Sequence, residues 1–301
     1  MNYRHAFHAG NFADVVKHAA LCLLVARLAE KPKPFFVLDT HAGLGEYDLL
    51  ADPAMRTGEW THGIARVFAR SDAPAEMAPY LDAVRALNPD GTLRWYPGSP
   101  RLVRGLLRPG DRLLANELHE EDAQTLARTF AREPGIEIRA GDGYVAVKAA
   151  LPPRERRGLV FIDPPFERKD EFAALARALR QGLRRFATGV FAAWYPVKDR
   201  PGPDAFLGEI ADGRIARVSL AEFLMHPADD PRRLSGCGLV FVNAPFGFET
   251  ALQAAWGWCA QTLGAAGGVR IETLVPEMPR PETKTARTGS PIRAVTDSGE
   301  A

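Results

Sequence analysis

Short apolar runs that end in an acid or a turn recur along this chain, with helical patterns between them. The first run is FFVLD at 35–39, which leads into the glycine-containing turn THAGLG. Runs of this kind, without polar alternation, are typical of strands buried on both faces of a sheet. Further buried runs lie at 113–118, 159–166, 190–196 and 237–245, a strand followed by a turn is predicted at 136–143, and edge or antiparallel strands are predicted at 214–224 and 269–275. Strands that alternate with helices predict an α/β fold with a doubly wound, mostly parallel sheet.

The first predicted helix spans residues 11–29, where apolar residues recur at helical spacing. Asn11 is expected to cap its N-terminus, with Asp14 near the positive end of the helix. Pro32 and Pro34 follow its end. The other helical patterns lie at 119–132, 144–150, 170–186, 203–211 and 248–263.

The spacing between Gly45 and Glu117 predicts an insertion. In a nucleotide-binding βαβ unit, the acid at the end of the second strand lies about 20 residues beyond the glycine turn. Here the separation is 72 residues. We therefore expect a helical insertion subdomain at 49–96, with one of its helices at 76–87. The main domain then comprises 1–48 and 97–278, and the polar residues 279–301 are expected to form a disordered tail.

The composition is that of a globular protein, with 46% hydrophobic and 25% charged residues among 301. This apolar content excludes a disordered chain, and no run approaches the roughly 18 apolar residues of a membrane span. The N-terminus carries charges where a signal peptide has its apolar core, so we expect a cytoplasmic protein. The three cysteines are not in CxxC spacing, which fits a reducing compartment and argues against a cysteine zinc site.

Overall charge says little about partners, because 38 basic residues face 37 acidic ones. The distribution is uneven, however. Residues 151–200 hold 11 Lys and Arg against 6 Asp and Glu. Such a local excess fits a protein that touches a polyanion with one face. A solvated helix surface is the alternative interpretation.

The turn from Asp39 to Gly45 is a candidate nucleotide site, because glycines after a strand let a ligand approach the backbone. The NAD fingerprint requires a third glycine at position 48, where this chain has Asp48. A carboxylate there would repel a pyrophosphate. S-adenosylmethionine (SAM) has no phosphate and carries a cationic amino group and sulfonium, so a turn flanked by carboxylates suits it. An ordinary β-turn with two glycines is the alternative.

Acids follow the next two predicted strands. Glu117 at the second strand end is placed to accept hydrogen bonds from both ribose hydroxyls of a nucleoside. The pair Asp142-Gly143 follows the third strand, where the acid is able to accept from an adenine amino group. The alternatives are a surface acid at 117 and a simple Asp-Gly turn at 142–143.

The segment Asp163-Pro164-Pro165-Phe166 after LVFI carries the most specific signal. Two prolines at a strand end keep the backbone extended and remove its donors. What is left is a carboxylate and carbonyl acceptors beside an aromatic ring. A planar amino group with two N–H donors fits these acceptors, while its ring stacks on Phe166. The segment resembles motif IV of SAM-dependent methyltransferases that act on exocyclic amines.

Other motifs extend this resemblance in order along the chain. They are Tyr3-Arg4-His5, His8-Ala9-Gly10-Asn11, Asp14, Lys17-His18, LDTHAG at 38–43, RTGE at 56–59, YPGSP at 96–100, Glu117, Asp142-Gly143, IDPPF at 162–166, and FATG with WYP within 186–196. Together they resemble the RlmJ family, bacterial 23S ribosomal RNA adenine-N6 methyltransferases with a Rossmann-like fold. The resemblance covers about residues 1–276. Phe166 stands where relatives often have tyrosine, which keeps the stacking face and loses a hydroxyl.

The resemblance implies SAM as cofactor, 23S rRNA as partner and a set of site residues. The implied cofactor contacts are Lys17, His18, His41, Ser99, Glu117, Asp142, Gly143 and Asp163. The implied catalytic group is Asp163 with Pro164 and Phe166, and Tyr3 is expected to touch the RNA. Arginines of the basic stretch are candidate phosphate contacts: Arg154, Arg156, Arg157, Arg184 and Arg185.

Two alternatives stay open, and a metal site does not. A DNA adenine-N6 methyltransferase shares the DPPF chemistry, and a non-catalytic rRNA-binding or assembly factor shares the fold. His5, His8 and His18 lack an acid or cysteine partner at ligand spacing, so no metal site is expected. We expect a monomer.

Overall fold

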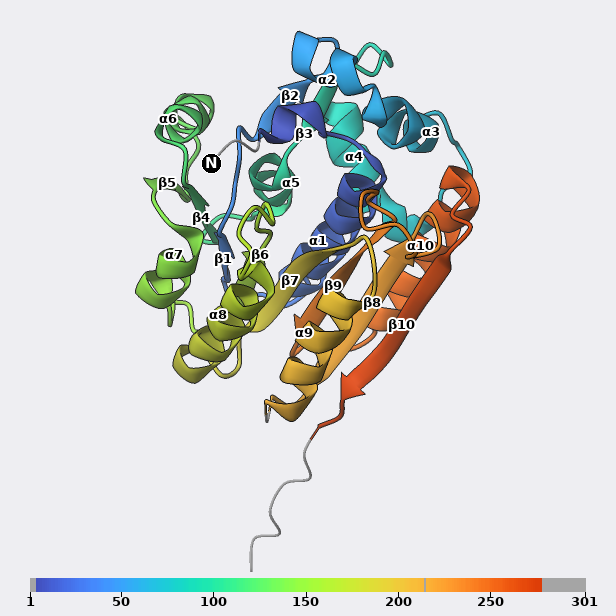
Figure 1. The fold of residues 1–301 in the computed structure, drawn as a ribbon. Coiled ribbons are helices and arrows are strands. Elements are labelled where there is room, and N and C mark those ends of the chain that lie inside the picture. The colour runs from blue at the N-terminus through green and yellow to red at the C-terminus, as the bar shows by residue number, and fades with distance from the viewer. Residues whose placement is uncertain (1–3, 214, 278–301) are drawn as a thin grey trace, which may run out of the picture.

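An eight-stranded sheet forms the centre of the molecule in the described part of the chain (Figure 1). The structure is a computed structural model, and it describes residues 4–213 and 215–277. The strand order is β10-β8-β9-β7-β6-β1-β4-β5. The strands are β1 (Phe36–Asp39), β4 (Arg112–Glu117), β5 (Ile136–Ala140), β6 (Gly158–Ile162), β7 (Val190–Val197), β8 (Val218–Leu224), β9 (Gly236–Val242) and β10 (Gly268–Val275).

Strands β5, β4, β1, β6 and β7 pair in parallel, so their carboxyl ends meet at one edge of the sheet. The order reverses at β1, which lies between β4 and β6. A crevice at such a switch point is where open α/β sheets bind ligands. Strand β9 runs antiparallel to β7 and β8, and β10 runs antiparallel to β8. The predicted α/β fold with a mostly parallel sheet is confirmed.

Helices cover both faces of the sheet, and alternate residues of its inner strands are buried on opposite sides. In β1 and the residue before it, Phe35 and Val37 belong to one hydrophobic cluster and Phe36 and Leu38 to the other. The first cluster lies under α1 (Phe12–Ala29), α5 (Ser99–Leu106), α6 (Glu120–Thr129) and α10 (Phe248–Leu263). The second lies under α7 (Gly143–Ala150), α8 (Glu171–Arg185) and α9 (Pro201–Asp212). This double cover explains why the strands read as continuous apolar runs.

Helix α1 is buried on nearly every side, and its sequence shows why it is placed there. Asn11 caps it by accepting a hydrogen bond from Asp14 N at 2.9 Å, as predicted. Most of its residues are apolar, yet Asp14, Lys17 and His18 are buried with them. Buried charges persist only where they are paired or face a polar site.

The residues between β2 (Glu46–Asp48) and β3 (Trp95–Pro97) form short helices. These are α2 (Asp52–Thr57), η2 (Glu59–His62), α3 (Ile64–Phe68), η3 (Ala75–Met77) and α4 (Ala78–Ala86). Their buried residues, such as Tyr80 and Leu81, belong to the same cluster as α1 and α10. The inserted helices therefore pack directly on the core of the main sheet, and the domain division at 49–96 stays a prediction. The two three-residue strands that close the insertion are too short for periodicity to detect.

Two sequence predictions fall outside the described residues: the RNA contact of Tyr3 and the tail at 279–301. None of the helices that the structure describes is both long enough and apolar enough to cross a membrane.

Candidate active site

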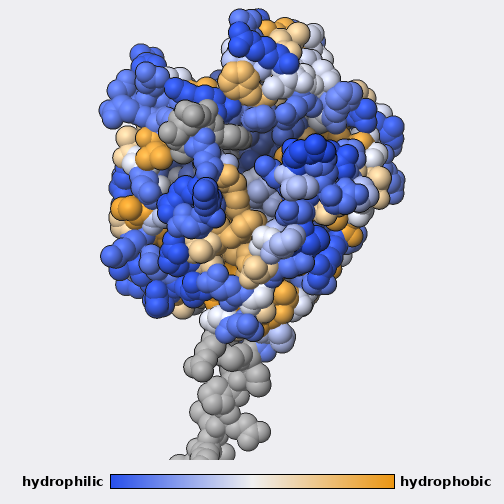
Figure 2. Space-filling view, viewed as in Figure 1, coloured by the Kyte–Doolittle hydropathy of each residue, from blue (hydrophilic) through white to orange (hydrophobic). Residues whose placement is uncertain are grey.

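A cavity of about 910 Å³ opens at the carboxyl edge of the sheet. It is lined by α1 and by the segments that follow β1, β4, β6 and β7. Figure 2, viewed as in Figure 1, shows a recess in the upper half of the molecule that is bordered mainly by hydrophilic residues. The volume is at the upper end of the roughly 300–1,000 Å³ that is usual for ligand pockets, which leaves room for more than one ligand group.

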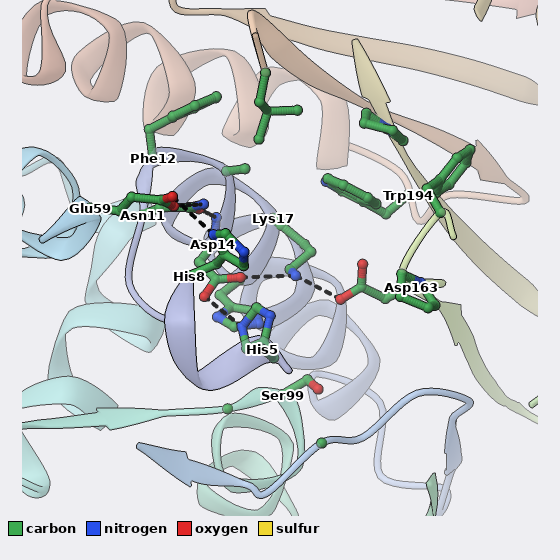
Figure 3. Close-up of a pocket in the computed structure, with 18 of the residues that line it drawn as sticks. His5, His8, Asn11, Phe12, Asp14, Lys17, Glu59, Ser99, Asp163 and Trp194 are labelled. Atoms are coloured by element: carbon green, nitrogen blue, oxygen red, sulfur yellow. Dashed lines mark hydrogen bonds and ion pairs between the residues drawn. The ribbon is translucent and has the colours of Figure 1, made fainter. Parts of the chain in front are cut away.

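The centre of the cavity is a buried chain of charges, Asp163–Lys17–Asp14 (Figure 3). Lys17 Nζ lies 2.6 Å from Asp163 Oδ2 and 2.9 Å from Asp14 Oδ1. The side chains of Lys17 and Asp163 are only 6% and 13% exposed. Asp14 and Lys17 share one face of α1 because they are three residues apart. The helix therefore presents an acid and a base together to the loop after β6.

Asp14 anchors this chain. Its Oδ2 accepts from Gly10 N at 2.9 Å and lies 2.9 Å from His5 Nε2. Burial alone would raise the pKa of Asp14, but His5 and Lys17 hold that pKa well below its ordinary value. Asp14 therefore stays ionised and fixes both Lys17 and the N-terminal segment. From the sequence, Asp14 was expected as an acid near the positive end of the helix and as part of the family motif, although its spacing from Lys17 signals the pair.

Asp163 faces the cavity beside two aromatic rings. Burial raises the pKa of its carboxyl above the ordinary value, and Lys17 opposes that rise. The Phe166 ring lies 5.9 Å from the Trp194 ring, which is itself 5.5 Å from Lys17 Nζ. Phe166 has a φ of +52°, a conformation that non-glycine residues rarely adopt and that is common at functional sites. Trp194 was predicted as part of a strand and of the WYP motif but not as a site residue, and an indole at the end of a buried strand is a weak signal by itself.

Glu117, at the end of β4, lines the cavity on the side of β1 opposite to Asp163. We call the lining on this side the cofactor wall. Glu117 Oε2 accepts from Gly43 N at 2.8 Å and its Oε1 accepts from His119 N at 2.9 Å. The carboxylate is thus held in place by backbone donors while keeping lone pairs for a ligand. His119 also lines the cavity, and its buried Nε2 has no hydrogen-bond partner in the described structure. His119 was not among the site residues predicted from the sequence.

Three further predicted cofactor residues line the same side of the cavity. Burial lowers the pKa of His18 to about 3 and that of His41 to about 4, so both rings are neutral near pH 7. His18 Nδ1 lies 2.8 Å from Tyr96 Oη, and His41 Nδ1 lies 2.8 Å from Thr40 Oγ1. Ser99 is buried at the start of α5.

Asp39 lies fully buried behind this wall. Burial raises the pKa of its carboxyl to about 7, and the nearby charge of Asp163 acts in the same direction. A hydrogen bond from the Ser99 side chain opposes this rise, while Asp39 Oδ2 has no partner of good hydrogen-bond geometry among the described residues. An unpaired acceptor at this depth is costly unless a ligand or a proton satisfies it.

Asp142 and Gly143 lie next to the cavity rather than on its lining. Asp142 Oδ1 caps α7 by accepting from Tyr144 N at 2.8 Å and Val145 N at 3.1 Å. A Cβ at Gly143 would collide with Thr40 O and with the His41 ring. The glycine therefore lets α7 pack against the turn after β1, and Asp142 keeps its second oxygen for a ligand.

The arginines predicted to contact phosphate lie at the opposite edge of the sheet. Helix α8 starts near Asp163 and runs away from it, so its last turn, with Arg184 and Arg185, lies about 20 Å further on. Arg185 Nε donates to Leu151 O at 2.8 Å. Arg157 Nη1 donates to Lys33 O at 2.7 Å, and Arg154 pairs with Glu155. Arg156 lies in the same turn before β6. The structure does not bring these residues to the cavity, and their contact with RNA stays a prediction.

The N-terminal histidines have partners within the protein. His5 pairs with Asp14, and His8 Nδ1 lies 2.9 Å from Glu59 Oε1, which raises the pKa of His8. Within residues 4–213 and 215–277, no group of three or more His, Cys, Asp or Glu side chains has the arrangement of a metal site.

Comparison with known proteins identifies the family. A family model described as RsmJ, ribosomal RNA large subunit methyltransferase D, RlmJ, matches residues 32–275. The chain belongs to this family. It is 40% identical over 279 residues to ribosomal RNA large subunit methyltransferase J of Escherichia coli K12, covering 92% of this chain and 100% of that protein. The protein of the same name from Haemophilus influenzae is 39% identical over 280 residues, with the same coverage.

A solved structure also resembles this RlmJ-family fold. A crystal structure of a Legionella pneumophila protein has a TM-score of 0.82 and 33% identity, covering 88% of this chain and 98% of that one. The family resemblance and the methyltransferase fold predicted from the sequence are therefore confirmed.

Proposed function

We propose that this RlmJ-family protein transfers a methyl group from SAM to the N6 amino group of one adenine in 23S rRNA. The observation that carries the proposal is the position of Asp163-Pro164-Pro165-Phe166 at the end of β6, facing a cavity that Lys17 and Trp194 share. Family membership supplies the class of RNA, and the acceptor-rich loop beside an aromatic ring supports an exocyclic amine as the target.

The residues around β1 fit SAM. Glu117 is fixed by two backbone donors and has lone pairs for ribose hydroxyls, while Asp142 has a second oxygen for the adenine amine. The buried carboxyl of Asp39 lies behind the lining residue Ser99, and its negative charge, when ionised, would favour a cationic ligand group in the cavity. His18, His41 and Ser99 complete this wall with neutral side chains. SAM, when bound, supplies a methyl group activated by its sulfonium.

Asp163 is the residue that orients the target amine. Lys17 holds Asp163 Oδ2, which leaves Oδ1 to accept a hydrogen bond from the N6 amino group. The Pro164 carbonyl accepts the second N–H, since neither proline offers a competing donor. Two acceptors favour a more tetrahedral nitrogen, whose lone pair is otherwise delocalised into the ring. Holding that nitrogen in line with the methyl group contributes several kcal/mol, of the order of 7 or more for well-oriented reactants.

Phe166 and Trp194 provide the stacking surface for the adenine. Their rings are 5.9 Å apart and meet edge to face, so one of them is able to stack on a base while the other borders its edge. The adenine has to leave its helical stack to reach this depth, at a cost of about a few kcal/mol, and less when the RNA is unpaired. Base stacking on an aromatic side chain offsets about 1–3 kcal/mol of that cost.

The experiment that tests this function compares methyl incorporation from labelled SAM into protein-free 23S rRNA and into duplex DNA. We expect incorporation into the rRNA, with N6-methyladenosine as the product in a nuclease digest analysed by mass spectrometry. Incorporation into duplex DNA instead would establish the DNA alternative. Absence of SAM binding in calorimetry would favour a non-catalytic rRNA-binding factor. We also propose that the protein acts as a monomer in the cytoplasm, which sedimentation and cell fractionation test.

A further inference from the structure

The cavity continues beyond Asp163 into a second end, which the proposed methyl transfer does not use. We call it the distal end, and it is formed by the end of β7, the loop 225–235 between β8 and β9, helix α3 and the end of α10. The side chains considered below are Arg66, Lys198, Met225, Arg233, Leu234 and Leu263. Because β8 points in the same direction as β7, loop 225–235 lies at the same edge of the sheet as Asp163.

Strand β7 leads directly from the catalytic centre to the distal end. Trp194, Pro196 and Lys198 all line the cavity, and alternate residues of a strand point to one side. Four residues along a strand span about 13 Å. Lys198 therefore lies about one or two nucleotides away from the base that Trp194 contacts.

The lining of the distal end carries more basic than acidic side chains. Lys198 is exposed and forms no ion pair or hydrogen bond with any residue in the described ranges. Arg66 donates to Leu263 O at 3.1 Å and lies 3.1 Å from His62 Nδ1, so neither of these partners is an acid. Arg233 pairs with Asp229 at 3.4 Å, and an exposed pair of this kind contributes little.

Acids on the cavity lining do not offset the charges of Arg66 and Lys198. The cavity-lining carboxylate nearest in sequence to Arg66 is Glu59, and both of its oxygens are occupied, by His8 at 2.9 Å and by Asn11 at 2.9 Å. The other elements of the distal end contribute no carboxylate to the lining that the structure describes. This region of the cavity therefore attracts anions.

Between the cations the wall is apolar, with Met225, Leu234 and Leu263 facing the cavity. Loop 225–235 is held in place by backbone hydrogen bonds, because Ser235 N donates to Val197 O and His226 N donates to Ser235 O. Basic side chains around an apolar surface are the arrangement by which proteins bind single-stranded nucleic acid, with phosphates on the cations and bases on the apolar groups.

We propose that the distal end binds the unpaired nucleotides that flank the target adenosine, with Lys198 and Arg233 contacting their phosphates. Met225 and Leu234 border the adjacent base. The inference rests on the proposed function, since it takes the strand entering the cavity to be RNA. It assigns RNA contact to the carboxyl edge of the sheet, through residues that the sequence analysis did not select.

A double variant with a matched control tests this assignment. Lys198→Ala with Arg233→Ala removes two cations from the distal end. Lys148→Ala with Arg232→Ala removes the same two residue types elsewhere: Lys148 lies on α7, and Arg232 neighbours Arg233 but is 89% exposed and pairs with Asp230. Neither control residue lines the cavity. Affinity for an RNA fragment containing the target site is measured from low to moderate salt, together with SAM affinity, melting temperature and KM and kcat for the RNA.

We expect the distal-end variant to bind the RNA about tenfold more weakly at 0.1 M salt, and to lose about 1.4 from the slope of log K against log salt. KM for RNA should rise by a similar factor, while kcat at saturating RNA, SAM affinity and melting temperature stay as in the wild type. The control should change RNA affinity less than twofold. A neutral methylphosphonate beside the target adenosine should weaken wild-type binding and leave the distal-end variant unaffected.

Equal salt slopes in the distal-end variant and the control would overturn the assignment, as would a fall in kcat with unchanged KM. These results differ from a failure of the proposed function, in which the wild-type protein itself methylates no RNA. The melting temperature separates either result from misfolding.

Discussion

The two edges of the central sheet use their charges in different ways. At the carboxyl edge, Asp14, Lys17 and Asp163 are buried around a cavity and pair with one another. At the opposite edge, arginines donate to backbone carbonyls, as Arg157 does to Leu28 O and Arg185 does to Leu151 O. The first arrangement leaves acceptors and cations facing a ligand, whereas the second stabilises the ends of helices and turns.

The direction of the chain explains this difference. Parallel strands end at the carboxyl edge, where side chains of the following loops surround the switch point. The helices that connect the parallel strands end at the other edge, where their last carbonyls lack partners within the helix. Arg108 Nη1, for example, donates to Ala29 O at the end of α1 and to Lys31 O just beyond it. A basic excess counted along the sequence mixes residues from both edges.

The largest effect is expected at Asp163. If its carboxylate acts as a hydrogen-bond acceptor, Asp163→Asn keeps an oxygen for the N6 amine and loses about 10²–10³-fold in turnover, the scale of one preorganised hydrogen bond. Asp163→Ala should remove detectable turnover. Single-turnover methylation of 23S rRNA at saturating SAM measures both. The methylated amine becomes strongly acidic, so its proton is able to leave to water without a strong base.

Equal inactivity of the Asn and Ala variants, with normal SAM binding and folding, would show that Asp163 is a general base. Lys17 complicates the Asn variant, because an amide oxygen accepts from Nζ but no longer neutralises it. A control at Asp170, which is exposed and pairs with Arg168 in the same loop, should leave turnover unchanged when replaced by Asn.

The next effect is a pH dependence of stability caused by Asp39. Its folded pKa of about 7 lies above the ordinary value, so between about pH 4 and 7 the folded state binds the proton that the unfolded state has lost. The free energy of unfolding should therefore fall as the pH rises through this window, by the order of a few kcal/mol. Asp39→Asn keeps the acceptor for His41 N and removes the titration.

Urea unfolding of the two proteins at pH 5 and pH 8 measures this difference. We expect Asp39→Asn to be more stable than the wild type at pH 8, with a clearly smaller difference at pH 5 that vanishes below about pH 4. If the free energy of unfolding changed equally with pH in the wild type and the variant, the ionised carboxylate of Asp39 would have to be well solvated or paired. If the prediction holds, adding SAM at pH 8 should stabilise the wild type more than the variant, because a cationic ligand favours the ionised acid.

Glu117 comes next in expected size. Glu117→Ala removes a charged acceptor for the ribose hydroxyls and should weaken SAM binding by about 1–3 kcal/mol. It also frees Gly43 N and His119 N, so part of the loss comes from the turn itself. Glu117→Gln keeps one acceptor oxygen, so its affinity for SAM should lie between that of the wild type and that of the Ala variant. Calorimetry with SAM measures all three proteins, and an unchanged affinity in the Ala variant would place the ribose elsewhere.

Much of the fold and of the cofactor wall follows from the sequence, because strand ends carry a recognisable signal. The acids at Glu117 and Asp163 follow apolar runs, and both line the cavity. His18 and Ser99 came from the family resemblance, since a helix histidine and a turn serine carry no signal of their own. Asp14, His119 and Trp194 were not identified as site residues. Their roles depend on how α1, α6 and β7 meet in space, which local periodicity does not encode.

The smallest effects are expected at Arg184 and Arg185, and they decide whether the comparison of the two edges holds. The sequence predicted that their replacement by Ala weakens RNA binding and flattens its salt dependence. Their position at the end of α8 leads us to expect less than a twofold change in RNA affinity, compared with about tenfold for the distal-end variant. Arg185→Ala should cost about 1 kcal/mol of stability through the lost bond to Leu151 O, whereas exposed Arg184 should cost less. Salt titration of RNA binding beside urea unfolding separates the two roles. A flattened salt slope in this variant would mean that the RNA also reaches the edge of the sheet opposite the cavity. The RNA contact that composition predicts for the basic stretch at 151–200 would then be supported.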